Sequence, residues 1–197
     1  MLVHGAGSGP WVFDDWEAPP ELSLVPVDLH AGLDVATASM DDYARVLASS
    51  CAGLPRPLAL CGWSMGGLVV MMAAAEVAPE ALVLLEPSPP AEVQGTHEVA
   101  DARGVFDAEE VYGRFPKGVR ARPESLRARA DRKRGISVPP LPERSLVVFG
   151  DEFEDERGRA VAAHYGIRGD YFSSYDHWEL VIRPEVSHRV VDYALGR

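Results

Sequence analysis

The segment GWSMGG at residues 62–67 contains the residue types best suited to nucleophilic chemistry. It follows the apolar run LALC and precedes a stretch rich in Ala, Met and Gly, so we expect a strand, a sharp turn and a helix. In that setting the turn holds Ser64 strained and exposed, and the flanking glycines allow the backbone to pack closely around it. Free N–H groups at the start of the helix can stabilise an oxyanion. The pattern therefore predicts a nucleophilic serine rather than a plain glycine turn.

The segment HGAGSG at residues 4–9, directly after a short apolar run, is the second candidate. A dinucleotide-binding loop of the form G-x-G-x-x-G, counted from Gly5, would need glycine where the chain has Pro10. A phosphate-binding loop ending in Gly-Lys-Ser or Gly-Lys-Thr is also absent. We therefore expect this loop to present a backbone N–H group to a developing oxyanion.

Short apolar runs alternate with longer helical stretches along the chain. The expected strands cover residues 2–4, 24–29, 57–62, 81–85, 145–150 and 170–175. The expected helices cover residues 41–50, 65–78, 156–164 and 185–195. Several strands are apolar without alternation, as in a parallel sheet covered on both faces. We predict an α/β fold in one domain, residues 1–197, with a mostly parallel sheet of about six strands and helices on both faces.

Residues 88–142 interrupt this alternation and are expected to form a small inserted helical lid. Prolines mark both ends of the segment. Between residues 114 and 134 its many Arg and Lys side chains are opposed only by Glu124 and Asp131. We interpret these charges as a solvated helical face, with recognition of an anionic substrate as the alternative.

HGAGSG and GWSMGG together resemble the oxyanion loop and the nucleophile elbow of the α/β-hydrolase superfamily. The resemblance covers nearly the whole chain, but it begins at the family's third strand and lacks the first two antiparallel strands. It implies an α/β-hydrolase fold of the serine-nucleophile branch, with backbone N–H groups of Ala6 and Met65 forming the oxyanion hole. A serine nucleophile argues against the haloalkane dehalogenase and epoxide hydrolase branches, which use aspartate there.

The family places its catalytic histidine between the last strand and the C-terminal helix. Asp176-His177-Trp178 occupies that position here, so the resemblance implies that His177 is the general base. His4 belongs to the HG motif and is expected to be structural. Asp176 is not expected to orient His177, because the side chains of adjacent residues diverge.

The acidic member of the site is harder to place. The family's acid usually lies three residues after the glycine that ends strand 145–150, a position held here by Phe153. Some members use an acid one strand earlier, where Glu86 ends the run ALVLLE. We predict Asp151, because it directly follows a strand end and gives the serine, acid, histidine order of this fold. Glu86 and Asp155 are the alternatives.

Three tryptophans, Trp11, Trp63 and Trp178, each neighbour one of these motifs. Their large aromatic surfaces are suited to lining a substrate pocket for an acyl or aromatic group. Packing in the hydrophobic core is the alternative role for each of them.

Composition excludes several classes of protein. The composition, with 47% hydrophobic and 25% charged residues, is typical of a globular protein. A net charge of -11 argues against binding to nucleic acid or to an anionic membrane. No apolar run approaches the roughly 18 residues of a membrane helix, and the start of the chain lacks signal-peptide features. We expect a cytoplasmic protein in which Cys51 and Cys61 are reduced. We also expect a monomer, because Pro26 at the sheet edge prevents pairing with the edge strand of a second copy.

These observations predict a serine hydrolase that cleaves an ester or thioester bond of a small acyl substrate through an acyl-enzyme. No metal or organic cofactor is implied. Two alternatives stay open: a non-hydrolytic relative, such as a cofactor-free lyase or acyltransferase, and a non-catalytic ligand-binding protein of the same fold.

Overall fold

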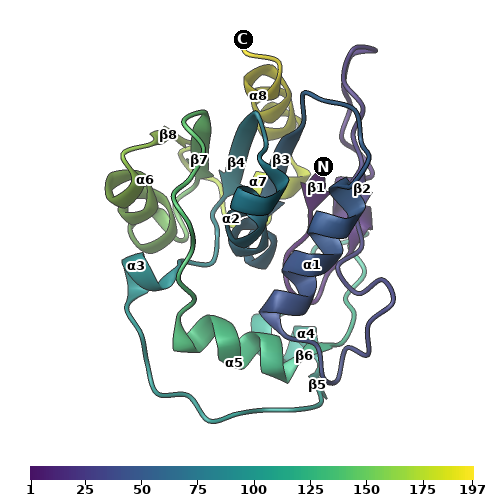
Figure 1. Cartoon of the computed structure of the whole chain (residues 1–197), viewed down its shortest axis with the longest axis vertical. Coiled ribbons are helices and arrows are strands. Elements are labelled where there is room, and N and C mark those ends of the chain that lie inside the picture. The colour runs from purple at the N-terminus through teal and green to yellow at the C-terminus, as the bar shows by residue number, and fades with distance from the viewer.

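The computed structural model describes all 197 residues and has a six-stranded parallel sheet at its centre (Figure 1). The strands lie in the order β2-β1-β3-β4-β7-β8. Their bounds are β1 Leu2–Val3, β2 Pro26–Val27, β3 Ala59–Trp63, β4 Ala81–Leu85, β7 Ser145–Phe149 and β8 Arg168–Tyr171. The α/β fold with a parallel sheet of about six strands, predicted from the sequence, is confirmed.

Helices cover both faces of the sheet, which explains its continuous apolar strands. Along β4, Leu82 and Leu84 pack into one hydrophobic core, and Val83 and Leu85 pack into the other. The first core is closed by α1 Met40–Cys51, α2 Met65–Val77 and α6 Ala160–Tyr165. The second is closed by a 3-10 helix, Pro10–Phe13, with α7 Glu179–Ile182 and α8 Pro184–Ala194 (Figure 1).

The observed elements differ from the expected ones mainly at their ends. The second strand shrinks to Pro26–Val27 and pairs only with β1, at the sheet edge where Pro26 was predicted to place it. The helix expected at 156–164 begins earlier, as a π-helical turn, Glu154–Arg159, that runs into α6. The start of that turn shapes one wall of the site described below.

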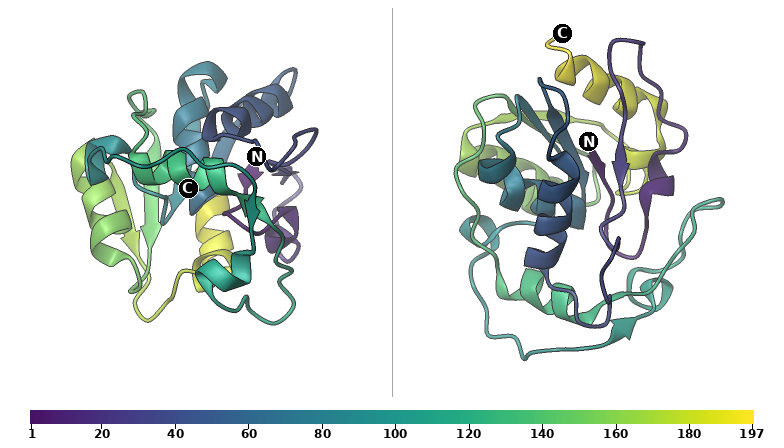
Figure 2. Two further views of the ribbon diagram at one scale, coloured as in Figure 1. Left: turned by 90° about the horizontal axis from the view of Figure 1, so that it is seen from below. Right: turned by 45° about the vertical axis from the view of Figure 1, so that its right-hand side comes forward.

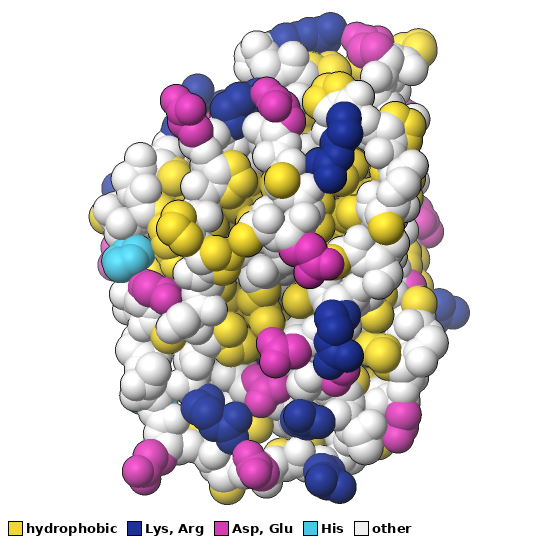
Figure 3. All heavy atoms as spheres, in the orientation of Figure 1, with side chains coloured by type: hydrophobic (Ala, Val, Ile, Leu, Met, Phe, Trp, Pro, Cys, Tyr) yellow, Lys and Arg dark blue, Asp and Glu magenta, His cyan; other side chains and the backbone are white.

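The segment between β4 and β7 is only partly helical. It contains α3 Ala91–Gln94, α4 Ala108–Tyr112 and α5 Leu126–Arg134, with a two-stranded antiparallel sheet of β5 Val105–Phe106 and β6 Glu124–Ser125. Figure 2 shows it crossing one end of the main sheet. On the face seen in Figure 3, Lys and Arg side chains at the lower end are interspersed with Asp and Glu. None of the helices combines the length and apolar character needed to cross a membrane.

Candidate active site

Ser64 lies in the sharp turn between β3 and α2, as GWSMGG predicted. Its backbone has φ 55° and ψ -118°, a conformation that non-glycine residues adopt only under strain. The turn is possible because Gly62 and Gly66 lack side chains. A Cβ atom at Gly62 would lie 2.2 Å from the Gly66 carbonyl oxygen, and one at Gly66 would lie 2.2 Å from the Val3 carbonyl oxygen. The close packing of helix on strand thus holds the serine at the carboxyl end of the sheet.

His177 lies in the loop between β8 and α7, and its closest charged partner is Glu86. The imidazole Nδ1 is 2.7 Å from Glu86 Oε2, while Glu86 Oε1 accepts a hydrogen bond of 2.8 Å from the Gly150 N–H group. Glu86 is fully buried and has a positive φ of 37° directly after β4. Burial lowers the pKa of His177 below its usual 6.5, and the hydrogen bond to Glu86 opposes that shift. The arrangement keeps the imidazole neutral with its Nδ1 tied to a carboxylate.

The prediction that Asp151 orients the histidine does not fit this geometry. Asp151 is exposed, and its Oδ1 atom accepts a hydrogen bond of 2.5 Å from the Tyr171 hydroxyl group. Asp155, the other alternative after β7, is also exposed, on the π-helical turn. Glu86 reaches the imidazole instead because β4 and β7 are neighbours, and its longer side chain spans the distance from the adjacent strand end.

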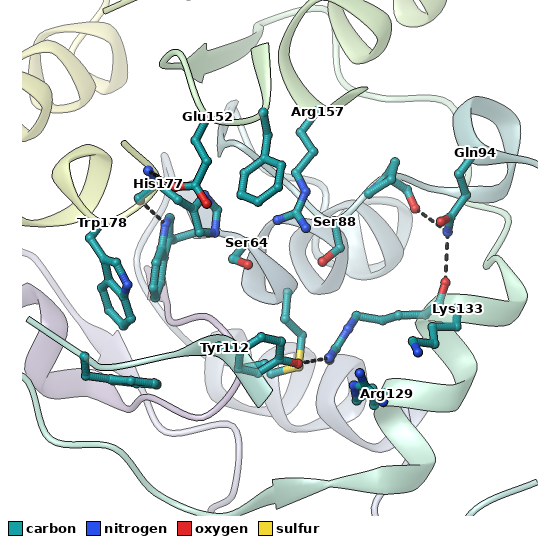
Figure 4. A pocket seen from close by; sticks show the side chains of 17 residues that line it. Ser64, Ser88, Gln94, Tyr112, Arg129, Lys133, Glu152, Arg157, His177 and Trp178 are labelled. Carbon is teal, nitrogen blue, oxygen red and sulfur yellow. Dashed lines mark hydrogen bonds between the residues drawn. The ribbon is translucent and has the colours of Figure 1, made fainter. Parts of the chain in front are cut away.

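Ser64 and His177 line one cavity of about 300 Å³ (Figure 4). The His177 Nε2 atom is buried and has no hydrogen-bond partner. With Nδ1 donating to Glu86, the lone pair of the imidazole lies on Nε2, where it can accept a proton. The two side chains are not hydrogen-bonded to each other in this structure. The strained Ser64 and the His177 imidazole, whose buried Nε2 atom has no hydrogen-bond partner, therefore line the same cavity.

Ala6 and Met65, the predicted oxyanion donors, both line the same cavity. Neither backbone N–H group bonds to another protein group: Met65 is the first residue of α2, and Ala6 lies in the loop after β1. Unpaired N–H groups at such positions are suited to receiving negative charge.

The loop that carries Ala6 is held by a buried carboxylate from the inserted segment. Glu124 Oε2 accepts a hydrogen bond of 3.1 Å from the Gly7 N–H group. Its other oxygen accepts from the Tyr43 hydroxyl and lies 3.3 Å from His30 Nε2. Burial alone would raise the pKa of Glu124, but the interactions with His30 and Tyr43 outweigh it and lower the pKa to about 2. Glu124 is thus an ionised link between β6 and the loop that carries Ala6.

His4 has the structural role predicted for it. It is fully buried, and its Nδ1 atom lies 2.8 Å from the Gly5 carbonyl oxygen. Its Nε2 atom lies 3.2 Å from the Leu29 amide and 2.9 Å from Arg122 Nη2. Arg122 in turn donates to Asp28 at 2.7 Å, so a second polar chain ties the inserted segment to the start of the sheet.

Aromatic side chains form one wall of the cavity. Trp63 and Trp178 both line it, with ring centroids 4.7 Å apart, and Phe115 lies 4.7 Å from Trp178. Trp63 Nε1 donates to the His177 carbonyl, which fixes the histidine loop. Trp11, proposed for the pocket as well, does not line the cavity: the Arg120 guanidinium group stacks over its ring, and the Arg120 carbonyl oxygen accepts a hydrogen bond from its Nε1 atom.

Sequence reasoning missed several residues of the cavity. Glu152 lines it and accepts a hydrogen bond from the His177 backbone N–H group. Arg157, on the π-helical turn, also lines it and was not singled out from the sequence. The helix α5 contributes Arg129 and Arg132, whose spacing of three residues indicates a shared helix face. No group of three or more His, Cys, Asp or Glu side chains is placed to share a metal ion.

A parallel sheet with both faces covered and a serine at a strained strand-to-helix turn define the architecture of an α/β hydrolase. The chain belongs to the alpha/beta hydrolase family, whose model matches residues 1–194. The resemblance inferred from the two motifs is therefore confirmed. The sequence matches none of the curated proteins with which it was compared.

Solved structures similar to this chain share its fold at low sequence identity. A methylesterase, MES16 from Arabidopsis, is 17% identical with a TM-score of 0.61, over 99% of this chain and 97% of that chain. A pyrethroid hydrolase from Sphingobium faniae JZ-2 is 16% identical with a TM-score of 0.58, over 98% and 95%. A tomato methylketone synthase I is 15% identical with a TM-score of 0.58, over 98% and 95%. These neighbours include both hydrolases and a synthase, so the reaction must be argued from the site.

Proposed function

We propose that the protein is a serine hydrolase that cleaves an ester or thioester bond of a small acyl substrate. The observation that carries this proposal is that Ser64 and His177 line one cavity, with His177 Nδ1 held by the buried Glu86 carboxylate and His177 Nε2 without a hydrogen-bond partner. This is the arrangement that a general base needs to accept a proton from a serine hydroxyl group.

In the first half-reaction, Ser64 Oγ forms a bond to the acyl carbon as His177 Nε2 takes the hydroxyl proton. The charge that develops on the carbonyl oxygen is stabilised by the N–H groups of Ala6 and Met65. The bond to the leaving alcohol or thiol then breaks, and the protonated imidazole returns the proton to that group. Glu86 stabilises the imidazolium and keeps Nδ1 as the donor.

In the second half-reaction, water attacks the acyl carbon while His177 Nε2 accepts one of its protons. The same N–H groups receive the second oxyanion. The bond to Ser64 Oγ then breaks, the imidazole returns the proton to the serine, and the free acid leaves. If an alcohol or thiol replaced water, the result would be acyl transfer.

A fluorophosphonate probe followed by peptide mass mapping tests the nucleophile. We expect one covalent adduct, on Ser64, and no adduct in the Ser64→Ala variant. Ser88 offers a matched control, because it lines the same cavity; the Ser88→Ala variant should still be labelled. Labelling of Ser88 in the Ser64→Ala variant, or none in the native protein, would contradict the proposal.

Turnover of p-nitrophenyl esters with and without an added alcohol or thiol acceptor then separates hydrolysis from transfer. We expect the free acid as the product in both cases, and Ser64→Ala should lower kcat by several orders of magnitude. Product that forms only with the acceptor would assign the site to acyl transfer, and labelling without turnover would favour a binding protein.

A further inference from the structure

Four basic side chains line the cavity that contains Ser64 and His177. Arg129, Arg132 and Lys133 come from α5, and Arg157 comes from the π-helical turn after β7. In Figure 4, Arg129 and Lys133 extend from one helix, and the Arg157 guanidinium group points into the cavity from a separate wall. Segments remote in sequence thus deliver positive charge to the same space.

None of these four side chains forms a salt bridge. Arg132 is 9% exposed and donates a hydrogen bond of 3.0 Å to the Tyr112 hydroxyl group. Arg157 lies over the Phe153 ring, 3.9 Å from its centroid, and Arg129 lies 5.6 Å from the centroid of Phe106. The aromatic rings hold the guanidinium groups without neutralising them.

Two basic residues of the inserted segment that do not line the cavity do form salt bridges. Arg134, the last residue of α5, pairs with Asp131 and with Asp101. Arg122, earlier in the inserted segment, pairs with Asp28. The chain has a net charge of -11 and therefore contains more acidic than basic residues. None of these acidic residues forms a salt bridge with the four basic side chains of the cavity.

Glu152 is the only acidic side chain that lines the cavity. It accepts a hydrogen bond from the His177 backbone N–H group, so one carboxylate faces four cations. Unpaired charge in a partly buried site is unfavourable unless a ligand of opposite charge completes it. Desolvation lowers the pKa of Arg157, which agrees with a guanidinium group held away from water.

We propose that the substrate carries, besides its ester or thioester bond, an anionic carboxylate or phosphate group that Arg129, Arg132 and Arg157 bind. Arginine is suited to this role, because its planar fork binds carboxylate and phosphate oxygens through two hydrogen bonds. A cavity of about 300 Å³ holds a small molecule. This inference rests on the proposed hydrolase function and names the class of substrate for the same site.

The kinetic test compares two esters matched in length, p-nitrophenyl hexanoate and the mono-p-nitrophenyl ester of adipic acid. We expect the charged ester to have a kcat/KM at least ~10-fold higher, since a charged hydrogen bond is worth about 1.5–3 kcal/mol. The preference should weaken as ionic strength rises. Equal values for the two esters, or a preference for the neutral ester, would overturn the proposal.

Variants identify which cations are responsible. Arg129→Gln and Arg157→Gln should each reduce the ratio of kcat/KM for the charged ester to kcat/KM for the neutral ester ~10-fold, mainly through a higher KM for the charged ester. Arg157→Lys should retain part of the preference. Arg127→Gln is the matched control: Arg127 lies on the same helix, is exposed, and does not line the cavity. Equal losses with both esters would refute a role in charge recognition.

A binding test on the Ser64→Ala variant separates this proposal from the proposed reaction, since it needs no turnover. Calorimetry with adipate, hexyl phosphate and hexan-1-ol should show binding of at least one anion and none of the alcohol. Comparison of adipate with hexyl phosphate shows whether the site prefers a carboxylate or a phosphate group. Addition of the Arg129→Gln and Arg157→Gln substitutions should abolish anion binding. Absence of binding by both anions, or anion binding that survives the arginine substitutions, would refute it.

Discussion

Replacement of Glu86 by Gln tests the assignment of the orienting acid most directly. In the structure one carboxylate oxygen accepts from the Gly150 N–H group and the other faces His177 Nδ1. A glutamine has one acceptor oxygen and one NH₂ group in place of the two oxygens. If that oxygen stays on Gly150, the NH₂ group donates to Nδ1 and forces the imidazole proton onto Nε2.

That tautomer has no lone pair on Nε2 with which to accept the serine proton. The opposite orientation of the amide would leave the buried Gly150 N–H group facing an NH₂ group, at a cost of about 1–3 kcal/mol. The unproductive tautomer is therefore favoured. We expect Glu86→Gln to lower kcat about 10⁴-fold, as the equivalent amide substitution does in a serine protease. This corresponds to about 5 kcal/mol of lost transition-state stabilisation.

The assay is steady-state hydrolysis of p-nitrophenyl hexanoate, with circular dichroism and urea unfolding to verify the fold. Asp151→Asn is the matched control, because Asp151 is exposed and bonds to Tyr171; its kcat should stay within about threefold of the native value, as for other surface changes. A Glu86→Gln variant with kcat within tenfold of native, or an Asp151→Asn variant with the larger loss, would refute the reasoning.

Three further predictions concern pH, strain and the oxyanion loop. The activity should rise with pH to a plateau, because His177 must be neutral to act as a base. The lowered pKa of His177 places the midpoint of this rise below pH 6.5. A pH profile of kcat/KM with a midpoint at or above 6.5 would contradict this. The free energy of unfolding of the Ser64→Gly variant should be ~1 kcal/mol higher than that of the Ser64→Ala variant, since glycine relieves the strain at φ 55°. Urea titration of both variants measures this difference, and an equal or lower value for Ser64→Gly would count against stored strain. Glu124→Gln should lower the free energy of unfolding by ~1–3 kcal/mol. Because the pKa of Glu124 falls from 4.5 to about 2 on folding, this difference should be full above pH 4.5 and shrink towards pH 2, and a pH-independent difference would be inconsistent with an ionised Glu124.

The features that the sequence predicted well are set by short stretches of chain. GWSMGG contains both the apolar strand end and the glycines whose missing side chains permit the turn, so the position of Ser64 depends on neighbours within a few residues. The parallel sheet follows in the same way from apolar runs that alternate with helical stretches.

The sequence alone could not identify the acidic residue that contacts His177, because acidic residues follow the ends of two neighbouring strands and either could reach the histidine. Glu86 follows β4 and Asp151 follows β7, and these strands are paired neighbours. The structure places Glu86 against His177, with a backbone φ of 37° at Glu86 and with the Gly150 N–H group bonded to its second oxygen. Both are tertiary features without a signature in the residue types.

The charged face of α5 was foreseen only as an excess of basic residues. The sequence did not show which of these side chains share a helix face, or whether that face meets solvent or the cavity. The prediction favoured solvent; the structure brings Arg129, Arg132 and Lys133 to the cavity. The position of the basic side chains of α5 depends on how the inserted segment packs across the strand ends. That packing depends in turn on contacts such as those of Glu124 and Arg122.

The bond between Glu124 and Gly7 bears on how this protein could be re-engineered. An inserted segment over a hydrolase site invites exchange for another, to change which substrates are accepted. Here the segment carries the acceptor that holds the loop of Ala6, the proposed oxyanion donor, so we expect a transplanted segment without Glu124 to disturb the geometry of the proposed oxyanion hole as well as selectivity. A graft that keeps β6 and Arg122, and varies only α3, α4 and the cavity side of α5, would leave that support in place.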